Sequence, residues 1–245
     1  MIFFYITYEE VLIMKKALVL NSGGVDSTTC VGIAIDTWGK ENVSTVSVFY
    51  GQKHCKELKC AEKIAEHYGV PHYEINLAEI VSHSNCPLLA HSTEEIKHQS
   101  YAEQIAENGE GMVSTYVPFR NGLMLAAVTA LAVSLYPHDE VEVYLGAHAD
   151  DAAGRAYADC SEEFTDAMGK AIGIGTYDKV SLQAPLVNMT KKEVVKTGLA
   201  LGVPYELTWS CYEGGEKQCG TCGTCLDRKA AFAANGVADP VPYAE

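Results

Sequence analysis

The stretch Ala17-Leu18-Val19-Leu20-Asn21-Ser22-Gly23-Gly24-Val25-Asp26-Ser27-Thr28-Thr29 decides the fold of this 245-residue chain. Its four leading apolar residues predict a short buried strand, and the two adjacent glycines predict a sharp turn. Apolar residues at helical spacing over residues 27–38 then predict a helix. In sheets built from such units, ligands bind at the carboxyl ends of the strands, where this turn lies.

The glycine turn has the composition of a phosphate-binding loop. Its glycines let backbone N–H groups come close to an anion, and the following helix directs its N-terminal dipole at the same point. An ordinary strand-to-helix turn also favours glycine and serine, and a Gly-Gly pair alone would favour that plainer interpretation. The whole string favours a phosphate site, because hydroxyl side chains surround the turn: Ser22, Ser27, Thr28 and Thr29. The Gly-Lys-Ser/Thr ending of a Walker loop is missing.

Strands and helices alternate along the rest of the chain. Further strands are expected at 43–49, 72–77, 140–146 and 180–184, and further helices at 54–68, 123–135, 164–172, 190–201 and 226–234. This alternation predicts an α/β fold, a Rossmann-like parallel sheet with helices on both faces. Residues 79–115 show no clear element, and we expect a mobile lid or insertion there.

Four of the nine cysteines form a C-x7-C-x2-C-x2-C array near the C-terminus: Cys211, Cys219, Cys222 and Cys225. Thiolates at this spacing can surround one tetrahedral ion, and four soft ligands select zinc or an iron–sulfur cluster. Four protein ligands leave no open coordination position, so a zinc ion here would be structural. We expect one structural Zn²⁺ per chain, with an iron–sulfur cluster and coincidental thiols as the alternatives.

The expected domain organisation follows from these segments. Residues 15–205 are interpreted as an ATP-binding α/β domain and residues 206–245 as a zinc-binding C-terminal segment. Residues 1–14 are interpreted as an N-terminal extension, because Met14-Lys15-Lys16-Ala17 reads like a natural start before a strand. The apolar run in that extension is too short to span a bilayer, so no membrane partner is expected.

Charge and cysteine usage narrow the class of partner and the compartment. Asp and Glu number 32 against 18 Lys and Arg, a formal net charge of −14. Nucleic-acid binding usually depends on a basic stripe, and here no window is strongly basic. We therefore expect a small-molecule substrate and no nucleic acid. The scattered remaining cysteines do not form a secreted disulfide framework, which favours a reducing cytoplasm.

Two further segments contain candidate cations. Tyr50-Gly51-Gln52-Lys53-His54 follows the second predicted strand, on the same edge as the glycine turn. Val117-Pro118-Phe119-Arg120-Asn121 precedes an apolar helix, where Arg120 could meet a phosphate or a carboxylate. A solvated loop cation and a charge at a helix start are equally good interpretations of the residues alone.

Candidate acids follow the fourth predicted strand. They belong to Gly146-Ala147-His148-Ala149-Asp150-Asp151 and to Tyr157-Ala158-Asp159-Cys160. Such carboxylates could pair with the donor edge of a guanine-like ring or hold Mg²⁺. A surface acid pair and a packed histidine are the plainer alternatives.

Taken together, these segments resemble a known family. The glycine turn resembles the pyrophosphate loop (PP-loop) of the N-type ATP pyrophosphatases. The chain also contains the segments quoted above that begin at Tyr50, Val117, Gly146 and Tyr157, followed by Thr208-Trp209-Ser210-Cys211-Tyr212. Together these segments resemble the 7-cyano-7-deazaguanine synthase family of queuosine biosynthesis, from about Lys15 to Arg228. Two departures are small, since Lys53 stands where the family often has arginine and the first cysteine gap looks one residue short.

The resemblance implies a fold of the adenine nucleotide alpha-hydrolase type and an ATP-dependent carbon–nitrogen ligase. The implied reaction converts 7-carboxy-7-deazaguanine and ammonia to 7-cyano-7-deazaguanine through an adenylated acid and an adenylated amide. ATP and Mg²⁺ are the implied cofactors, with a possible homodimer. Implied catalytic residues are Asp26, Lys53 and Arg120. Implied nucleotide contacts are Asn21, Ser22, Gly23, Gly24, Val25, Asp26, Ser27, Thr28, Thr29, Cys30 and Val31. Candidate substrate contacts are His148, Asp150, Asp151 and Asp159.

Two rival functions remain at this point. A tRNA thiolase or another PP-loop ligase would have the same glycine turn, but it would bind RNA, which the acidic balance disfavours. A non-catalytic zinc-ribbon protein that binds nucleotide would release no AMP, and it would leave the segments around Asp26 and Arg120 without a role.

Overall fold

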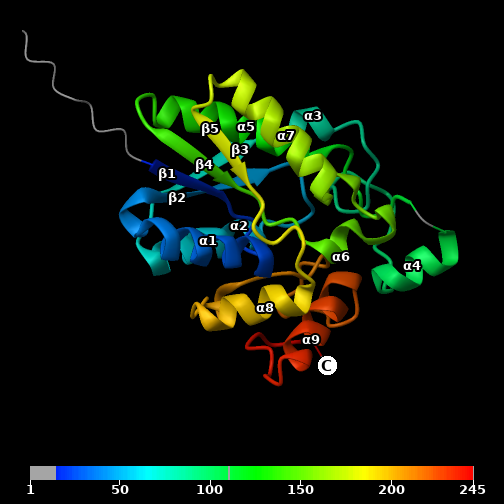
Figure 1. The fold of residues 1–245 in the computed structure, drawn as a ribbon. Coiled ribbons are helices and arrows are strands. Elements are labelled where there is room, and N and C mark those ends of the chain that lie inside the picture. The colour runs from blue at the N-terminus through cyan, green and yellow to red at the C-terminus, as the bar shows by residue number, and fades with distance from the viewer. Residues whose placement is uncertain (1–14, 110, 245) are drawn as a thin grey trace, which may run out of the picture.

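The structure is a computed structural model that describes residues 15–109 and 111–244. The predicted N-terminal extension, residues 1–14, lies outside the described residues. One parallel sheet runs through the centre of the fold and helices cover both of its faces (Figure 1). The predicted fold class is therefore confirmed.

Five strands form the sheet in the order β3-β2-β1-β4-β5, and every neighbouring pair is parallel. The strands are β1 (Lys15–Leu20), β2 (Val43–Phe49), β3 (His72–Asn76), β4 (Glu140–Tyr144) and β5 (Val180–Gln183). Chain order proceeds outward from β1 in one direction and then, after β3, continues from β4 in the other. The carboxyl ends of β1 and β4 thus form the point at which the strand order reverses, where such sheets bind ligands.

Alternating side chains of β1 supply two separate cores. Leu18 and Leu20 pack into a core with α5 (Arg120–Leu135) and α7 (Glu162–Gly175). Ala17 and Val19 pack into the other core with α1 (Val25–Trp38). Because a strand alternates its side chains between faces, an uninterrupted apolar run is what a strand covered on both faces requires.

The last two helices form a further layer on α1. Helix α8 (Lys191–Ala200) packs against α1, and α9 (Gly223–Ala234) packs against α8 (Figure 1). The remaining helical elements are α2 (Lys56–Tyr68), α3 (Ala78–Val81), α4 (Tyr101–Asn108), α6 (Ala149–Ala152) and the short 3₁₀ turns η1 (Lys40–Asn42), η2 (Ala153–Arg155), η3 (Ala158–Cys160) and η4 (Tyr205–Leu207). In the part of the chain that the structure describes, no helix is long and apolar enough to cross a bilayer.

The segment 79–115 differs from its prediction. It contains α4 and the end of α3, where no element was expected. A capping box begins α4: the Glu103 N–H donates to the Ser100 hydroxyl at 3.2 Å, and the Ser100 N–H donates to the Glu103 carboxylate at 2.8 Å. The Ser-x-x-Glu signal was present in the sequence, but an eight-residue helix has too few apolar positions to show a period. Leu89 of this segment is fully buried in the core, so the segment is packed in part.

Candidate functional site

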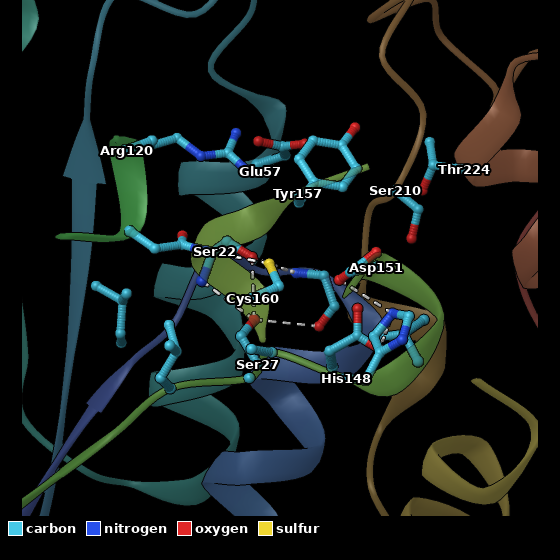
Figure 2. Close-up of a pocket in the computed structure, with 18 of the residues that line it drawn as sticks. Ser22, Ser27, Glu57, Arg120, His148, Asp151, Tyr157, Cys160, Ser210 and Thr224 are labelled. Atoms are coloured by element: carbon cyan, nitrogen blue, oxygen red, sulfur yellow. Dashed lines mark hydrogen bonds and ion pairs between the residues drawn. The ribbon is translucent and has the colours of Figure 1, made fainter. Parts of the chain in front are cut away.

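A cavity of about 220 Å³ lies at the carboxyl ends of β1 and β4. Its wall is formed by the glycine turn, by the loop after β4, and by residues of α2, α5 and α9 (Figure 2). Chain segments distant in sequence therefore meet at the switch point of the sheet. Of the predicted nucleotide contacts, those that line the cavity are Asn21, Ser22, Gly24, Val25, Asp26 and Ser27.

Hydrogen bonds hold the glycine turn in shape. The Asn21 side-chain oxygen accepts the Gly23 N–H at 3.0 Å and the Ser27 hydroxyl at 3.3 Å. The Ser22 N–H donates to the Ser27 hydroxyl at 3.1 Å. Gly24 is the N-cap of α1 and provides no side-chain cap. The first amides of α1 have no carbonyl within the helix to accept their hydrogen bonds, and they open beside the cavity where an anion could accept them.

Gly23 cannot carry a side chain in this arrangement. Its φ of 79° lies in the left-handed region, and a Cβ there would overlap the Glu57 carbonyl oxygen and approach the Ala61 amide nitrogen to 2.8 Å. The first turn of α2 is thus pressed against the glycine turn. The Trp209 N–H also donates to the Gly23 carbonyl at 2.8 Å, which joins the turn to the C-terminal segment.

Four of the predicted nucleotide contacts point elsewhere. Thr28 and Thr29 are fully buried, and their hydroxyls donate to the carbonyls of Gly24 at 2.6 Å and Val25 at 2.8 Å. The last two predicted contacts are fully buried in a hydrophobic core: Cys30 and Val31. These side chains hold the start of α1 in place from behind, and the cavity is lined by the residues before them.

A cluster of charges surrounds Asp26 at one end of the cavity. The Lys191 ammonium donates to both Asp26 carboxylate oxygens, at 2.7 and 2.5 Å. His148 Nε2 lies 3.8 Å from Asp26 Oδ1 and 3.2 Å from Asp151 Oδ2. Burial opposes ionisation of Asp26, but Lys191 and His148 outweigh it and lower the pKa of that carboxyl. Burial raises the pKa of Asp151, so the two carboxyls of this cluster differ in their tendency to ionise.

The other two predicted acids serve as helix caps. Asp150 lines the cavity, and its carboxylate accepts the Lys191 N–H at 2.7 Å at the start of α8. Asp159 is buried, and its carboxylate accepts the Asn121 N–H at 2.9 Å at the start of α5. Asp159 is not among the residues that line the cavity. Both carboxylates satisfy amides that would otherwise lack an acceptor.

The two predicted catalytic cations lie in different surroundings. Arg120 lines the cavity, where its guanidinium donates to the Tyr50 hydroxyl at 3.3 Å and lies 5.3 Å from the centre of the Tyr50 ring. Lys53 is exposed and donates to the Glu94 carbonyl at 3.3 Å, outside the cavity lining. The cation that reaches Asp26 is Lys191.

Three charged residues of the cavity were missed by the sequence analysis: Glu57, Lys191 and Asp227. Lys191 lies at the start of the helix predicted over residues 190–201, but that prediction did not indicate what the helix start faces. Burial raises the pKa of Glu57 to about 7 and that of Asp227 to about 6. No motif marked Glu57 or Asp227, because each joins the site only through the packing of its helix.

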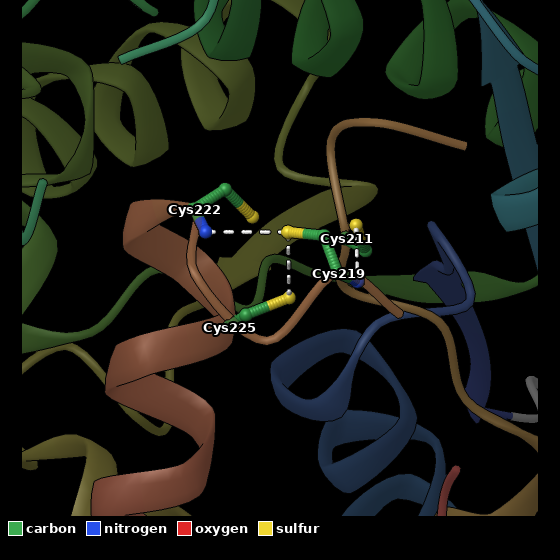
Figure 3. Close-up of side chains that lie close together, drawn as sticks. All are labelled: Cys211, Cys219, Cys222 and Cys225. Atoms are coloured by element: carbon green, nitrogen blue, oxygen red, sulfur yellow. Dashed lines mark hydrogen bonds between the residues drawn. The ribbon is translucent and has the colours of Figure 1, made fainter. Parts of the chain in front are cut away.

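The four predicted metal ligands come together beside α9 (Figure 3). Their sulfur atoms all lie within 4.8 Å of one another, and Cys211, Cys222 and Cys225 are fully buried. Four sulfurs bound to one Zn²⁺ at about 2.3 Å would lie about 3.8 Å apart, so only a small contraction separates this arrangement from a closed site. The amides of Thr221 and Cys222 donate to the Cys219 sulfur at 3.4 and 3.2 Å, as suits a thiolate ligand. The residues therefore fit a structural metal ion.

Comparison with known proteins reveals the family. Residues 16–236 match the family described as "Queuosine biosynthesis protein QueC". A 7-cyano-7-deazaguanine synthase of Archaeoglobus fulgidus is 40% identical over 227 residues, which cover 92% of this chain and 89% of that protein. One of Caldicellulosiruptor saccharolyticus is 41% identical over 228 residues, which cover 93% and 95%. Among solved structures, NMN synthetase from Francisella tularensis has a TM-score of 0.46 and 15% identity, over 91% of this chain and 77% of that one. The match across nine-tenths of the chain to QueC and to its curated relatives shows that this chain belongs to the 7-cyano-7-deazaguanine synthase family.

Proposed function

We propose that this chain is an ATP-dependent carbon–nitrogen ligase that converts 7-carboxy-7-deazaguanine and ammonia to 7-cyano-7-deazaguanine in queuosine biosynthesis. The observation that carries this proposal is the uncapped start of α1, which opens onto a cavity that also contains the Arg120 guanidinium. One end of the cavity suits a polyphosphate, and the other contains a cation suited to the acid. Ammonia as the nitrogen source, a homodimer and a cytoplasmic location belong to the same proposal.

The chemistry explains why ATP is needed. A carboxylate is a poor electrophile because oxide would have to leave. Attack of a carboxylate oxygen on the α-phosphorus forms an acyl adenylate and releases pyrophosphate. Ammonia then forms a C–N bond, AMP leaves with the electron pair of the C–O bond, and nitrogen loses a proton to give the amide. A second adenylation on the amide oxygen lets AMP leave again while nitrogen loses its remaining protons, which yields the C≡N bond.

The residues of the cavity suit both adenylations. The amides of Val25, Asp26 and Ser27 would bind pyrophosphate oxygens, and Lys191 would add a positive charge close to them. The Asp26 carboxylate, kept ionised by Lys191, would be a ligand for Mg²⁺, which when bound neutralises phosphate oxygens. Because the same carbon is activated twice, one site can serve both steps if it holds the ring still. The cysteine site would hold zinc in a structural role.

A tRNA thiolase is the nearest alternative. The formal net charge of −14 disfavours RNA binding by this chain. A non-catalytic nucleotide-binding protein would have no use for a partly buried ion pair at the start of α1, since removing charges from water is costly.

The test is incubation of the protein with ATP, ammonium and 7-carboxy-7-deazaguanine. We expect AMP, pyrophosphate and a product with the mass of the nitrile. Ser22→Ala and Asp26→Asn should abolish product formation. Formation of AMP with a tRNA substrate, and none with the acid, would instead favour the thiolase.

Lys191 and Lys192 offer a matched pair for the same assay. Lys191→Met removes the cation that contacts Asp26, and we expect kcat/KM to fall roughly 100-fold. Lys192 is exposed on the same turn of α8, and Lys192→Met should retain the wild-type rate. Equal rates in the two variants would remove Lys191 from the proposed phosphate site.

A further inference from the structure

Several carboxylates around the cavity already have a protein partner, so only some of the acids there are available to bind a guanine-like ring. Asp150 accepts a helix amide at 2.7 Å, Asp159 accepts another at 2.9 Å, and Asp151 faces His148 at 3.2 Å. Each of these carboxylates already has a protein partner. The pKa of Asp227 is raised by burial and by Asp151 and lowered by Lys191, which places it in the charge cluster around Asp26.

Glu57 shares with Asp227 the lack of a hydrogen-bonded partner among the described residues, but its neighbouring cation is Arg120, whereas Asp227 interacts with Lys191 and His148 of the cluster around Asp26. Glu57 lies in the first turn of α2 and lines the cavity. Within residues 15–109 and 111–244, its carboxylate takes part in no hydrogen bond and in no ion pair within 4.0 Å. Burial raises its pKa to about 7 although the Arg120 guanidinium acts in the opposite direction. A carboxyl with this pKa is one to which the protein supplies too few N–H donors.

The surroundings of Glu57 suit a flat ring. Figure 2 shows Glu57 and Arg120 on the side of the cavity away from Ser27 and His148. Tyr50 and Tyr157 line the same cavity, and each ring is more than nine-tenths buried. Aromatic rings contact a planar heterocycle over a large area, whereas a carboxylate and a guanidinium supply acceptors and donors at its edge.

We propose that Glu57 determines substrate specificity by accepting the ring N–H and the exocyclic amino group of the deazaguanine, with Arg120 donating to the neighbouring ring carbonyl. This inference rests on the proposed function and names the part of the site that reads the ring. A guanine-type edge presents two donors beside one acceptor, which two carboxylate oxygens beside a guanidinium complement. The ring carbonyl and the 7-carboxylate lie on the same side of the fused ring, so one guanidinium can face both.

The position of Glu57 also relates the ring to the nucleotide. Its backbone carbonyl is the atom that a Cβ on Gly23 would overlap, so its residue packs directly against the glycine turn. The ring would thus be held by an element that is pressed against the phosphate site. The carboxylate proposed to select the substrate and the turn proposed to bind ATP therefore belong to segments in direct contact.

The test compares two acids that differ by one donor: 7-carboxy-7-deazaguanine and its analogue without the exocyclic amino group. Binding of each is measured by calorimetry, and turnover with ATP and ammonium is measured in parallel. In Glu57→Gln the amide oxygen still accepts the ring N–H, but the amide NH₂ faces the exocyclic amino group. We expect affinity for the guanine acid to fall roughly 10- to 100-fold, with little change for the analogue.

Control variants distinguish a residue that recognises the ring from one that has only a structural role. Glu66→Gln changes an exposed acid on the same helix and should retain wild-type preference. Glu57→Asp keeps both oxygens and should retain the preference with weaker binding of both acids. If Glu57→Gln misfolds, as ATP-analogue binding would reveal, Glu57→Asp still tests the proposal, because loss of the preference there would contradict it.

Two outcomes would overturn the proposal. One is an equal loss of affinity for both acids in Glu57→Gln, which would indicate a general structural effect. The other is an unchanged preference. If wild-type protein binds the guanine acid preferentially but forms no nitrile, the proposed reaction fails while the role of Glu57 is still measured by the binding data.

Discussion

The ion pair between Asp26 and Lys191 is the main electrostatic feature at the proposed phosphate end of the cavity. Asp26 lies where burial would favour its neutral form, and the Lys191 ammonium at 2.5–2.7 Å reverses that preference. The pKa of Lys191 is raised in turn, against the effect of its own burial, mainly by Asp26 and Asp151. Each charge therefore depends on the other, which is why removal of one partner from such a pair is costly.

Gly23 and Gly69 allow the cost of backbone strain to be separated from the cost of overlap. Both have positive φ, 79° and 69°, but a Cβ at Gly69 would meet nothing within 4 Å. Gly69→Ala should lower the free energy of unfolding by about 1 kcal/mol. Gly23→Ala adds overlap with α2, and we expect a loss of about 2–5 kcal/mol together with loss of ATP binding. Urea unfolding measures the stability of each variant, and titration with an ATP analogue measures its nucleotide binding. Equal losses of stability in the two variants would mean that the contact with α2 contributes nothing.

The protonation of Glu57 predicts a pH dependence of substrate binding. Its pKa is raised to about 7, and only the ionised form can accept two N–H donors. Affinity for the acid should therefore be complete above pH 7 and fall about tenfold per unit below it. The Glu57→Gln variant should lack this dependence.

The control for this profile concerns the groups that surround Glu57. Arg120 lowers its pKa and Cys211 raises it, while Tyr50 and Cys60 also interact with it electrostatically. The pKa of Tyr50 is raised to about 12 and that of Cys60 is also raised, so neither titrates near pH 7. A profile that persists in Glu57→Gln would assign the titration to another group.

At the scale of elements, the helix starts around the cavity are treated differently. Helix α8 begins with a capping box between Thr190 and Glu193, and Asp150 accepts the next amide. The start of α5 is satisfied by Asp159. Gly24, the N-cap of α1, provides no side-chain cap, although this helix start opens onto the same cavity. Amides without a cap at a partly buried helix start have a use if an anion binds there.

The capping box of α8 has a measurable role, because the helix carries Lys191. Thr190 accepts the Glu193 N–H at 3.4 Å, and its own N–H donates to the Glu193 carboxylate at 2.8 Å. Thr190→Ala should lower the free energy of unfolding by about 1 kcal/mol in urea titration. Ser134→Ala, which removes an exposed hydroxyl that bonds within α5 at 2.8 Å, should change stability by less than about 0.5 kcal/mol.

At the scale of the whole molecule, the C-terminal segment is tied to the glycine turn at the carboxyl end of β1. The Trp209 N–H donates to the Gly23 carbonyl at 2.8 Å, two residues before the first metal-ligand candidate. Arg228 is fully buried and donates to Asp239 at 2.8 and 2.9 Å and to the Thr208 hydroxyl at 2.8 Å. Arg228 thus joins parts of the C-terminal segment to one another, while the Trp209 hydrogen bond and the packing of α9 on α8 hold that segment against the rest of the fold.

Loss of the metal should loosen this segment and then the glycine turn. We expect wild-type protein to contain about one zinc ion per chain and Cys222→Ser to contain much less. Hydrogen exchange should speed up over residues 206–245 and at Gly23 in that variant. Cys55→Ser, which changes an exposed thiol, should keep both the metal and the protection. Metal analysis that found iron and sulfide in place of zinc would assign the site to a cluster.

Much of the fold and part of the site could be predicted from the sequence, because their signals are local. The apolar run of β1, the glycine turn and the four cysteines each lie within a short stretch of sequence. In the structure they form a strand, a turn before a helix and a cluster of four sulfurs, as predicted. Helix α1 begins at Val25, two residues before its predicted start, because the turn is shorter than its hydroxyl-rich sequence suggested. Spacing along the chain is enough where neighbours in sequence are neighbours in space.

The tertiary structure alone decided which charged groups share the cavity. Lys191 and Asp26 are 165 positions apart, and only the packing of α8 on α1 brings them to 2.5 Å. The same packing directed Asp159 to a helix amide, kept Lys53 outside the cavity and placed Glu57 in its wall. A charged residue has no period and no preferred neighbour in sequence, so its partner is determined by topology. The physical reason is that the order of the strands in the sheet determines which helices and loops become neighbours, and spacing along the sequence does not specify that order.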